Sequence, residues 1–165
     1  MKEKLKDTKY QLLAVAILAL VLIYAAPSNG EIPEVPAEDE GFVEAEVFLQ
    51  DQNLQLIHGC RVLDMAISRE QASSIEYGIQ GELWERPGSH DLIKDILEGY
   101  EIDVIMVRVH DLQENAYRAD LFLKKDGTVY RLDSRPSDAI AIALRVGAPV
   151  KVEEDLFLEY GRSAC

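Results

Sequence analysis

Cysteine is scarce in this sequence of 165 residues, which contains only Cys60 and Cys165. Two cysteines are too few for the disulfide framework of a small secreted protein. Cys60 stands in an apolar run, which favours a place in the core, as is usual for a cysteine without a disulfide. Cys165 is the last residue, and we expect it to be a free thiol.

Several motifs that would identify a common type of site are also missing. The sequence has no glycine-rich phosphate loop, no zinc-ligand spacing and no nucleophile elbow. No repeat of 20–50 residues is present, which excludes solenoids and propellers. His58 and His110 stand singly at strand positions without the spacing of metal ligands, and we expect neither to bind a metal.

Basic residues are few relative to acidic ones: 17 lysines and arginines stand against 30 aspartates and glutamates, for a net charge of −13. Four of the lysines and only two acidic residues precede residue 31, so the remainder carries 13 basic and 28 acidic residues, a net charge of −15. A domain this acidic does not attract polyanions by its average field. Any nucleic acid that it handles needs a local basic pocket or bound metal ions.

The N-terminus has the pattern of a targeting or anchoring element. Residues 1–9 are basic, and residues 10–26 are apolar without a charge. Seventeen residues suit an uncleaved signal anchor, although a cleaved signal peptide and a buried helix of a soluble domain remain as alternatives. The lysines should stay in the cytoplasm, so we expect a membrane-anchored protein with its globular domain outside, or a secreted one if the signal is cleaved.

Residues 27–41 contain three prolines and five carboxylates with little to bury, which predicts an extended, solvated linker. The globular domain should therefore occupy residues 42–165. Its pattern predicts strands at 42–49, 54–58, 61–67, 102–109, 116–123, 128–132 and 150–152, and helices at about 68–79, 89–99 and 136–146. We therefore expect an α+β domain with a mostly antiparallel sheet and about three helices.

The helix at about 136–146 is predicted to be buried. Pro136 suits the first helical position, and six apolar residues follow Asp138 without a break. A helix that is apolar nearly all round has to be enclosed. Gly147 supplies the helix end, and Pro149 prevents continuation.

The starts of the last two predicted helices share one pattern, in which an arginine precedes a hydroxyl and a carboxylate in the first turn. Helix N-termini bind anions through free N–H groups, and arginine adds a bidentate phosphate donor. The predicted phosphate-binding residues are Arg86, Ser89, Arg135 and Ser137. The predicted metal ligands for Mg²⁺ or Mn²⁺ are Asp91, Asp133 and Asp138. The predicted catalytic residues are His90, as acid or base, with Asp91 and Asp138.

A purely structural interpretation explains the same residues. Serine and aspartate are common helix caps, and each arginine would then pair with the aspartate of the other helix. The two motifs would then hold the helices against the sheet and would carry out no chemistry.

The same motifs resemble those of a known family. Arg86-Pro87-Gly88-Ser89-His90-Asp91-Leu92 is similar to the Arg-Pro-x-Thr/Ser-His-Asp-Leu element of the bifunctional nuclease domain family. Asp133-Ser134-Arg135-Pro136-Ser137-Asp138-Ala139 is similar to its Asp-x-Arg-Pro-Ser-Asp-Ala element. The resemblance covers about residues 43–157 and implies an α+β fold, often dimeric, with nuclease activity on RNA and DNA in some members.

Two hypotheses of different classes follow. The first is a metal-dependent nuclease that hydrolyses phosphodiester bonds of RNA or DNA with Mg²⁺ or Mn²⁺ as cofactor. The second is a non-catalytic, membrane-tethered binding or assembly module of the same fold. A homodimer is compatible with either.

Overall fold

The computed structural model describes residues 40–81 and 86–165, and within them two sheets and four helices form an α+β fold. The five-stranded sheet has the order β1-β8-β5-β6-β7. Its strands are β1 (Phe42–Glu44), β8 (Val150–Glu153), β5 (Asp103–Gln113), β6 (Ala116–Lys125) and β7 (Thr128–Ser134). The four-stranded sheet has the order β2-β3-β4-β9. Its strands are β2 (Glu46–Gln50), β3 (Asn53–His58), β4 (Arg61–Ala66) and β9 (Arg162–Ser163).

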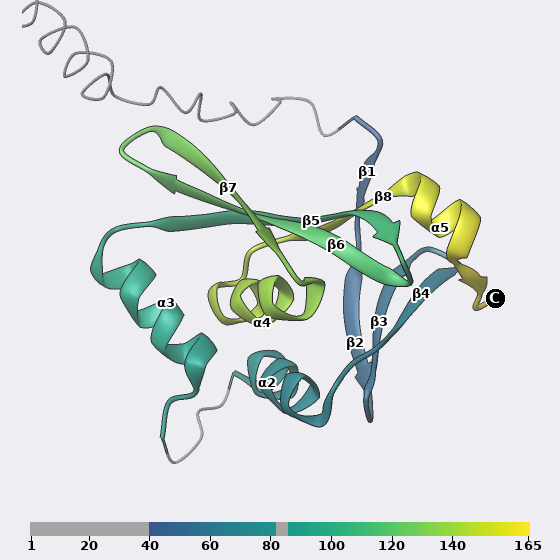
Figure 1. Ribbon diagram of the computed structural model, residues 1–165, viewed down its shortest axis with the longest axis horizontal. Coiled ribbons are helices and arrows are strands. Elements are labelled where there is room, and N and C mark those ends of the chain that lie inside the picture. Colours follow the sequence, from purple (N-terminus) through teal and green to yellow (C-terminus); the bar gives the residue numbers. More distant parts are fainter. Residues whose placement is uncertain (1–39, 82–85) are drawn as a thin grey trace, which may run out of the picture. The chain divides into compact units, whose positions relative to one another are not determined.

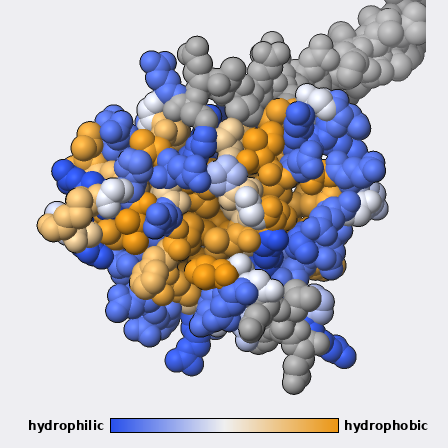
Figure 2. All heavy atoms as spheres, turned by 180° about the vertical axis from the view of Figure 1, so that it is seen from behind, coloured by the Kyte–Doolittle hydropathy of each residue, from blue (hydrophilic) through white to orange (hydrophobic). Residues whose placement is uncertain are grey.

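The helices are α2 (Arg69–Gln80), α3 (Ser89–Gly99), α4 (Pro136–Val146) and α5 (Glu154–Tyr160). Helix α4 lies against β5 and β6, and α2 and α3 pack on α4 (Figure 1). The main core lies between these elements and includes residues of both sheets. On the opposite side of the molecule from this view, apolar residues gather toward the middle and hydrophilic ones surround them (Figure 2).

The predicted burial of α4 is confirmed. Its residues from Ala139 to Ala143 are all buried, and Pro136 occupies the first turn. Gly147 ends the helix in the left-handed conformation, at φ 70°, which glycine adopts without steric cost. The enclosed helix holds the residues at its N-terminus in fixed positions.

Helix α2 approaches α4 closely enough to leave no room for a side chain at one position. A Cβ atom added to Gly78 would lie 3.0 Å from the Cβ of Leu144 and 3.2 Å from Nη1 of Arg145. At the other end of α2, Ser68 and Gln71 form a capping box.

The antiparallel fold class is confirmed, with three differences of detail. The strand predicted at 42–49 divides at Ala45: β1 pairs with β8 in one sheet, and β2 pairs with β3 in the other. Strands β5 and β8 are parallel neighbours in an otherwise antiparallel sheet. Helix α5 and strand β9 were not predicted, because no helix-start signal precedes α5 and β9 has only two residues.

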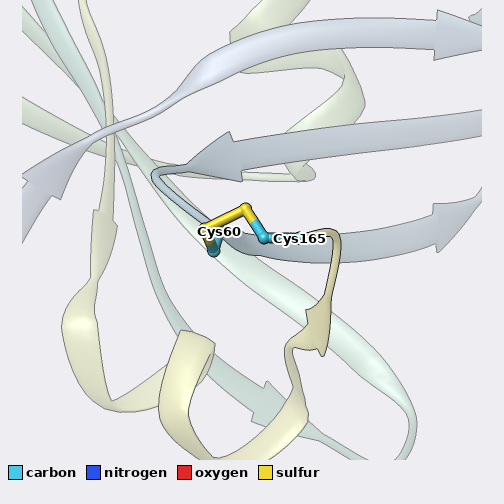
Figure 3. The surroundings of a disulfide bond; sticks show 2 residues. All are labelled: Cys60 and Cys165. Atoms are coloured by element: carbon cyan, nitrogen blue, oxygen red, sulfur yellow. A yellow bond between two sulfur atoms is a disulfide. The ribbon is translucent and has the colours of Figure 1, made fainter.

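The expectations for the cysteines are wrong. Cys60 is exposed in the turn between β3 and β4, and it forms a disulfide with Cys165 (Figure 3). The pairing arises because β9 adds to the edge of β4, with Arg61 opposite Ser163. This strand pairing carries the C-terminus to the turn that holds Cys60, an arrangement that spacing along the chain does not reveal.

Among residues 40–81 and 86–165, no helix is long and apolar enough to cross a membrane. The predicted basic segment 1–9, the predicted anchor 10–26 and the predicted linker up to residue 39 lie outside the described residues.

Candidate functional site

The two predicted helix starts meet at one cavity of about 350 Å³, which we call the α3–α4 cavity. Helix α2 supplies its remaining wall. The α3–α4 cavity is lined by Glu70, Gln71, Ser74, Arg86, Gly88, Ser89, His90, Asp91, Arg135, Asp138 and Arg145. Because the first N–H groups of a helix have no partner within the helix, the N-terminus of α3 at this cavity favours an anionic ligand. Helix α4 contributes Arg135 and Asp138 instead, since Pro136 has no N–H and the N–H of Asp138 donates to the backbone oxygen of Arg135.

The two arginines that precede the helices stand at the surface of the cavity. The side chain of Arg135 is 73 % exposed, and its Nε donates to Oδ2 of Asp138 at 2.7 Å. Arg86 is also exposed. An exposed pair such as Arg135–Asp138 contributes little to stability. Arg135 is therefore available to bind a ligand.

Asp91 has a structural role instead of facing the cavity as a free carboxylate. Its Oδ1 accepts from Nε of Arg145 at 2.6 Å, and its Oδ2 accepts from the backbone N–H of Gly88 at 2.7 Å. Burial alone would raise the pKa of Asp91, but the hydrogen bonds from Arg145 and Gly88 outweigh burial and hold this pKa below its ordinary value. Both oxygens are used, so Asp91 serves as a cap and as half of a buried ion pair.

The structural interpretation correctly predicts that Asp91 pairs with an arginine of another helix, but it predicts the wrong arginine. The cross-helix partner is Arg145 in the last turn of α4, whereas Arg135 pairs within its own helix. Arg145 also donates to the backbone oxygens of Ser74 and Ala141. It thus joins α2, α3 and α4 behind the cavity.

His90 lies between α2 and α4. Its Nδ1 is 2.8 Å from Oγ of Ser74, and its Nε2 is 3.6 Å from Oδ1 of Asp138. Burial lowers the pKa of His90 below 6.5, more than the neighbouring Asp138 carboxylate raises it. His90 is therefore neutral at pH 7, with one nitrogen held by Ser74 and the other next to a carboxylate.

The remaining predicted site residues are divided between the cavity and other surroundings. Ser89 lines the cavity. Ser137 is buried, and its Oγ accepts from Nε2 of Gln71 at 2.7 Å. Asp133 lines a second hollow, together with Arg135 and Asp138. In the β6–β7 ladder Asp133 stands opposite Asp120, which places both carboxylates on one face of the sheet.

The three predicted metal ligands thus have different surroundings, and the described part of the chain contains no group of three or more metal-ligating side chains. Mg²⁺ is often held by only one or two carboxylates together with phosphate oxygens of a substrate. Asp138 and Glu70 are the carboxylates on the cavity wall that are not committed to a buried ion pair. This donor set fits a cation that the substrate helps to hold.

Four further residues line the cavity although the sequence pattern did not predict them there: Ser74, Arg145, Gln71 and Glu70. Gln71 closes the capping box of α2, Glu70 lies within it and Ser74 follows it, and nothing local assigns any of the three to a site. Arg145 stands in the last turn of α4, where a cation is expected to complement the helix dipole. Only the packing of α2 and α3 against α4 reveals their common environment.

The fold and the site define a class of α+β domain in which two Arg-Pro helix starts meet at one cavity. The chain belongs to the bifunctional nuclease domain family, whose model matches residues 53–164. This match includes both motifs and all the residues of the cavity.

Individual relatives agree with the family match. An uncharacterised protein of Mycobacterium tuberculosis (strain ATCC 25618 / H37Rv) is 38 % identical over 108 residues, which cover 66 % of this chain and 64 % of the relative. Bifunctional nuclease 2 of Oryza sativa subsp. japonica is 36 % identical over 74 residues, 43 % of this chain and 23 % of that protein. Bifunctional nuclease 2 of Arabidopsis thaliana is 38 % identical over 74 residues, 43 % of this chain and 22 % of that protein. The chain therefore matches less than two thirds of the mycobacterial relative and under a quarter of the plant nucleases.

Proposed function

We propose that this chain is a nuclease that hydrolyses phosphodiester bonds of RNA or single-stranded DNA in the α3–α4 cavity. The observation that carries the proposal is the meeting of His90, Asp138 and Arg135 with the N-terminus of α3 around one cavity. The names of the plant relatives agree with this chemistry. The proposal assigns a task to each cavity-facing group.

Phosphate binding falls to Arg135 and Arg86, helped by the free N–H groups at the start of α3, including that of Ser89. These groups also supply the local positive charge that the domain needs, because its net charge is strongly negative. When Arg135 turns to a phosphate, it leaves Asp138 with its second neighbour, His90.

Proton transfer falls to His90. We assign the tautomer in which Nδ1–H donates to Oγ of Ser74, so that Nε2 takes the proton of the attacking water. Asp138, with Oδ1 3.6 Å from Nε2, stabilises the imidazolium that results. The attack breaks the bond between phosphorus and the leaving oxygen of the strand, and that oxygen takes a proton from solvent water. The lowered pKa of His90 keeps the base unprotonated at pH 7.

A divalent cation, Mg²⁺ or Mn²⁺, would be held by Asp138 and Glu70 and would neutralise charge on the phosphate. The residues of the chain would still bind the strand and move the proton as described above.

The second candidate, a non-catalytic binding or assembly module, is favoured by the use of Asp91 in a buried ion pair. Two of the six residues at 86–91, Gly88 and Asp91, make contacts that stabilise the fold and need no chemistry. The module hypothesis predicts a folded, membrane-tethered binding or assembly protein that cleaves no nucleic acid.

A cleavage assay separates the two candidates. Labelled single-stranded RNA and DNA oligonucleotides are incubated with the purified full chain in Mg²⁺, in Mn²⁺ and in chelator. The nuclease proposal expects cleavage with either cation, none in chelator, and a rate that falls as the pH drops through the lowered pKa of His90. No cleavage under any of these conditions, with a folded protein, would favour the module.

A further inference from the structure

Arg135 stands where three hollows of the surface meet. It lines the α3–α4 cavity, the second hollow that contains Asp133, and a third hollow of about 330 Å³. Gln71 lies on the walls of both the α3–α4 cavity and the third hollow, and Tyr117 lies on the walls of the second and third. When a phosphate of a nucleic-acid strand binds Arg135, the adjoining sugars and bases can therefore enter one of the neighbouring hollows.

The third hollow, which we call the Tyr117 hollow, differs chemically from the α3–α4 cavity. Apolar groups of β4, β6 and α4 form much of its lining, and polar groups stand among them. The apolar part of the lining includes Met65, Ile67, Pro136 and the ring of Tyr117, and the polar part includes Asn115 and Ser137. This combination suits a flat ligand with apolar faces and polar edges.

Tyr117 is the aromatic group of this hollow and is half-buried at its wall. It lies opposite Leu112 at the start of β6 and packs against the main core, which holds its ring in place. Burial and then the nearby Asp64 carboxylate raise the pKa of Tyr117 above its ordinary value of 10.0, so its hydroxyl stays protonated and can donate a hydrogen bond. Stacking of a base on such a ring contributes about 1–3 kcal/mol per base and tolerates any base.

We propose that the Tyr117 hollow binds the nucleobase next to the phosphate that Arg135 holds. The proposal rests on the proposed function, because it needs a phosphate at Arg135. The amide of Asn115 lines the hollow and offers both a donor and an acceptor to the polar edge of the base. A base that occupies this hollow is unpaired, so the subsite selects single strands over duplexes.

The test compares two oligonucleotides of equal length and charge, one with all its bases and one with abasic residues. Both carry phosphorothioate linkages that slow hydrolysis, and binding to the full chain is measured in Mg²⁺ by fluorescence anisotropy. We expect the base-bearing strand to bind about tenfold more tightly, the equivalent of about 1.4 kcal/mol.

Two variants of Tyr117 separate stacking from packing. Tyr117→Phe keeps the ring and should keep the preference for the base-bearing strand. Tyr117→Leu fills the core position without an aromatic ring and should bind both strands equally. Tyr100→Ala removes an exposed tyrosine at the end of α3, outside the hollow, and should behave as the unchanged chain.

Equal binding of the two strands by the unchanged chain would overturn the subsite while leaving the proposed function standing. A preference that persists in folded Tyr117→Leu would overturn it equally. If neither strand binds, the proposed function fails and the subsite fails with it.

Discussion

Asp91 shows that the position of a motif residue can be predicted from the sequence while its hydrogen-bond partners cannot. Its place in the first turn of a helix follows from Ser89-His90-Asp91 and is confirmed. Its partner could not be predicted, because Arg145 is 54 residues away and reaches Asp91 only through the packing of α3 on α4. His90 and Asp138 were predicted at the site, whereas Ser74, the neighbour of His90, carries no signal in the sequence.

The buried ion pair gives a prediction for stability. Asp91→Asn should lower the free energy of unfolding by about 3–5 kcal/mol, because it leaves the Arg145 guanidinium buried without its counter-charge. Both side chains are at most 7 % exposed. Urea denaturation measures the effect, and Asp95→Asn at an exposed position of the same helix is the matched control.

The same ion pair gives a pH dependence. Because the pKa of Asp91 is lowered in the folded chain from 3.8, its contribution is present above pH 3.8 and is lost as the pH falls through the folded pKa. The unchanged chain should therefore lose more stability on acidification than Asp91→Asn does. If the unchanged chain and Asp91→Asn lose the same amount of stability on acidification, the assigned role of Asp91 is contradicted.

At the scale of elements, the order of β5, β6, β7 and α4 follows from local patterns. The alternation of apolar residues, the Asp126-Gly127 turn and the helix start at Pro136 each depend on only a few neighbouring residues. These elements can therefore be predicted from one sequence. The division of the first predicted strand at Ala45 depends instead on which strands lie beside it. The two sheets therefore could not be separated from the sequence.

Strand β7 ends the five-stranded sheet, and within the described residues no strand lies on its outer side. Its Tyr130 and Leu132 are 40 % and 47 % exposed. Exposed apolar edge strands tend to pair with another strand. If two copies pair antiparallel about Leu132, Arg131 of each copy stands opposite Asp133 of the other, so the edge is complementary to itself in charge.

We therefore predict that a fragment of residues 32–165 forms a dimer through β7. Arg131→Asp should weaken the dimer, because two carboxylates then face each other, and the double change Arg131→Asp with Asp133→Arg should restore it. Sedimentation equilibrium measures the dimer constant, with Arg69→Asp on the exposed surface of α2 as control. A dimer equally strong in all variants would place the contact elsewhere, and a monomer at every concentration would refute it.

At the scale of the whole molecule, the disulfide joins residues 105 positions apart. Cross-links that close long loops are worth about 3–5 kcal/mol, because they restrict the unfolded chain. Stable disulfides are typical of oxidising compartments, which supports the proposal that the domain lies outside the cytoplasm. The predicted anchor at 10–26 points to the same location.

We predict that a reducing agent lowers the stability of the chain by about this amount, 3–5 kcal/mol. The variant with Cys60→Ser and Cys165→Ser should start at the lower stability and should not respond to the reducing agent. Denaturation curves with and without dithiothreitol measure both effects. Identical curves for the unchanged chain would show that the cross-link does not stabilise this fold.

The most direct test of phosphodiester cleavage in the α3–α4 cavity is single-turnover cleavage of a labelled single-stranded oligonucleotide in Mg²⁺ or Mn²⁺. Asp138→Asn and Arg135→Ala should each lower the cleavage rate by at least about 100-fold, a typical effect of removing a group that assists proton transfer or transition-state charge. Asp126→Asn, in the β6–β7 turn, should cleave as the unchanged chain does, and circular dichroism checks that every variant is folded. Cleavage at the unchanged rate in both folded cavity variants would contradict the account.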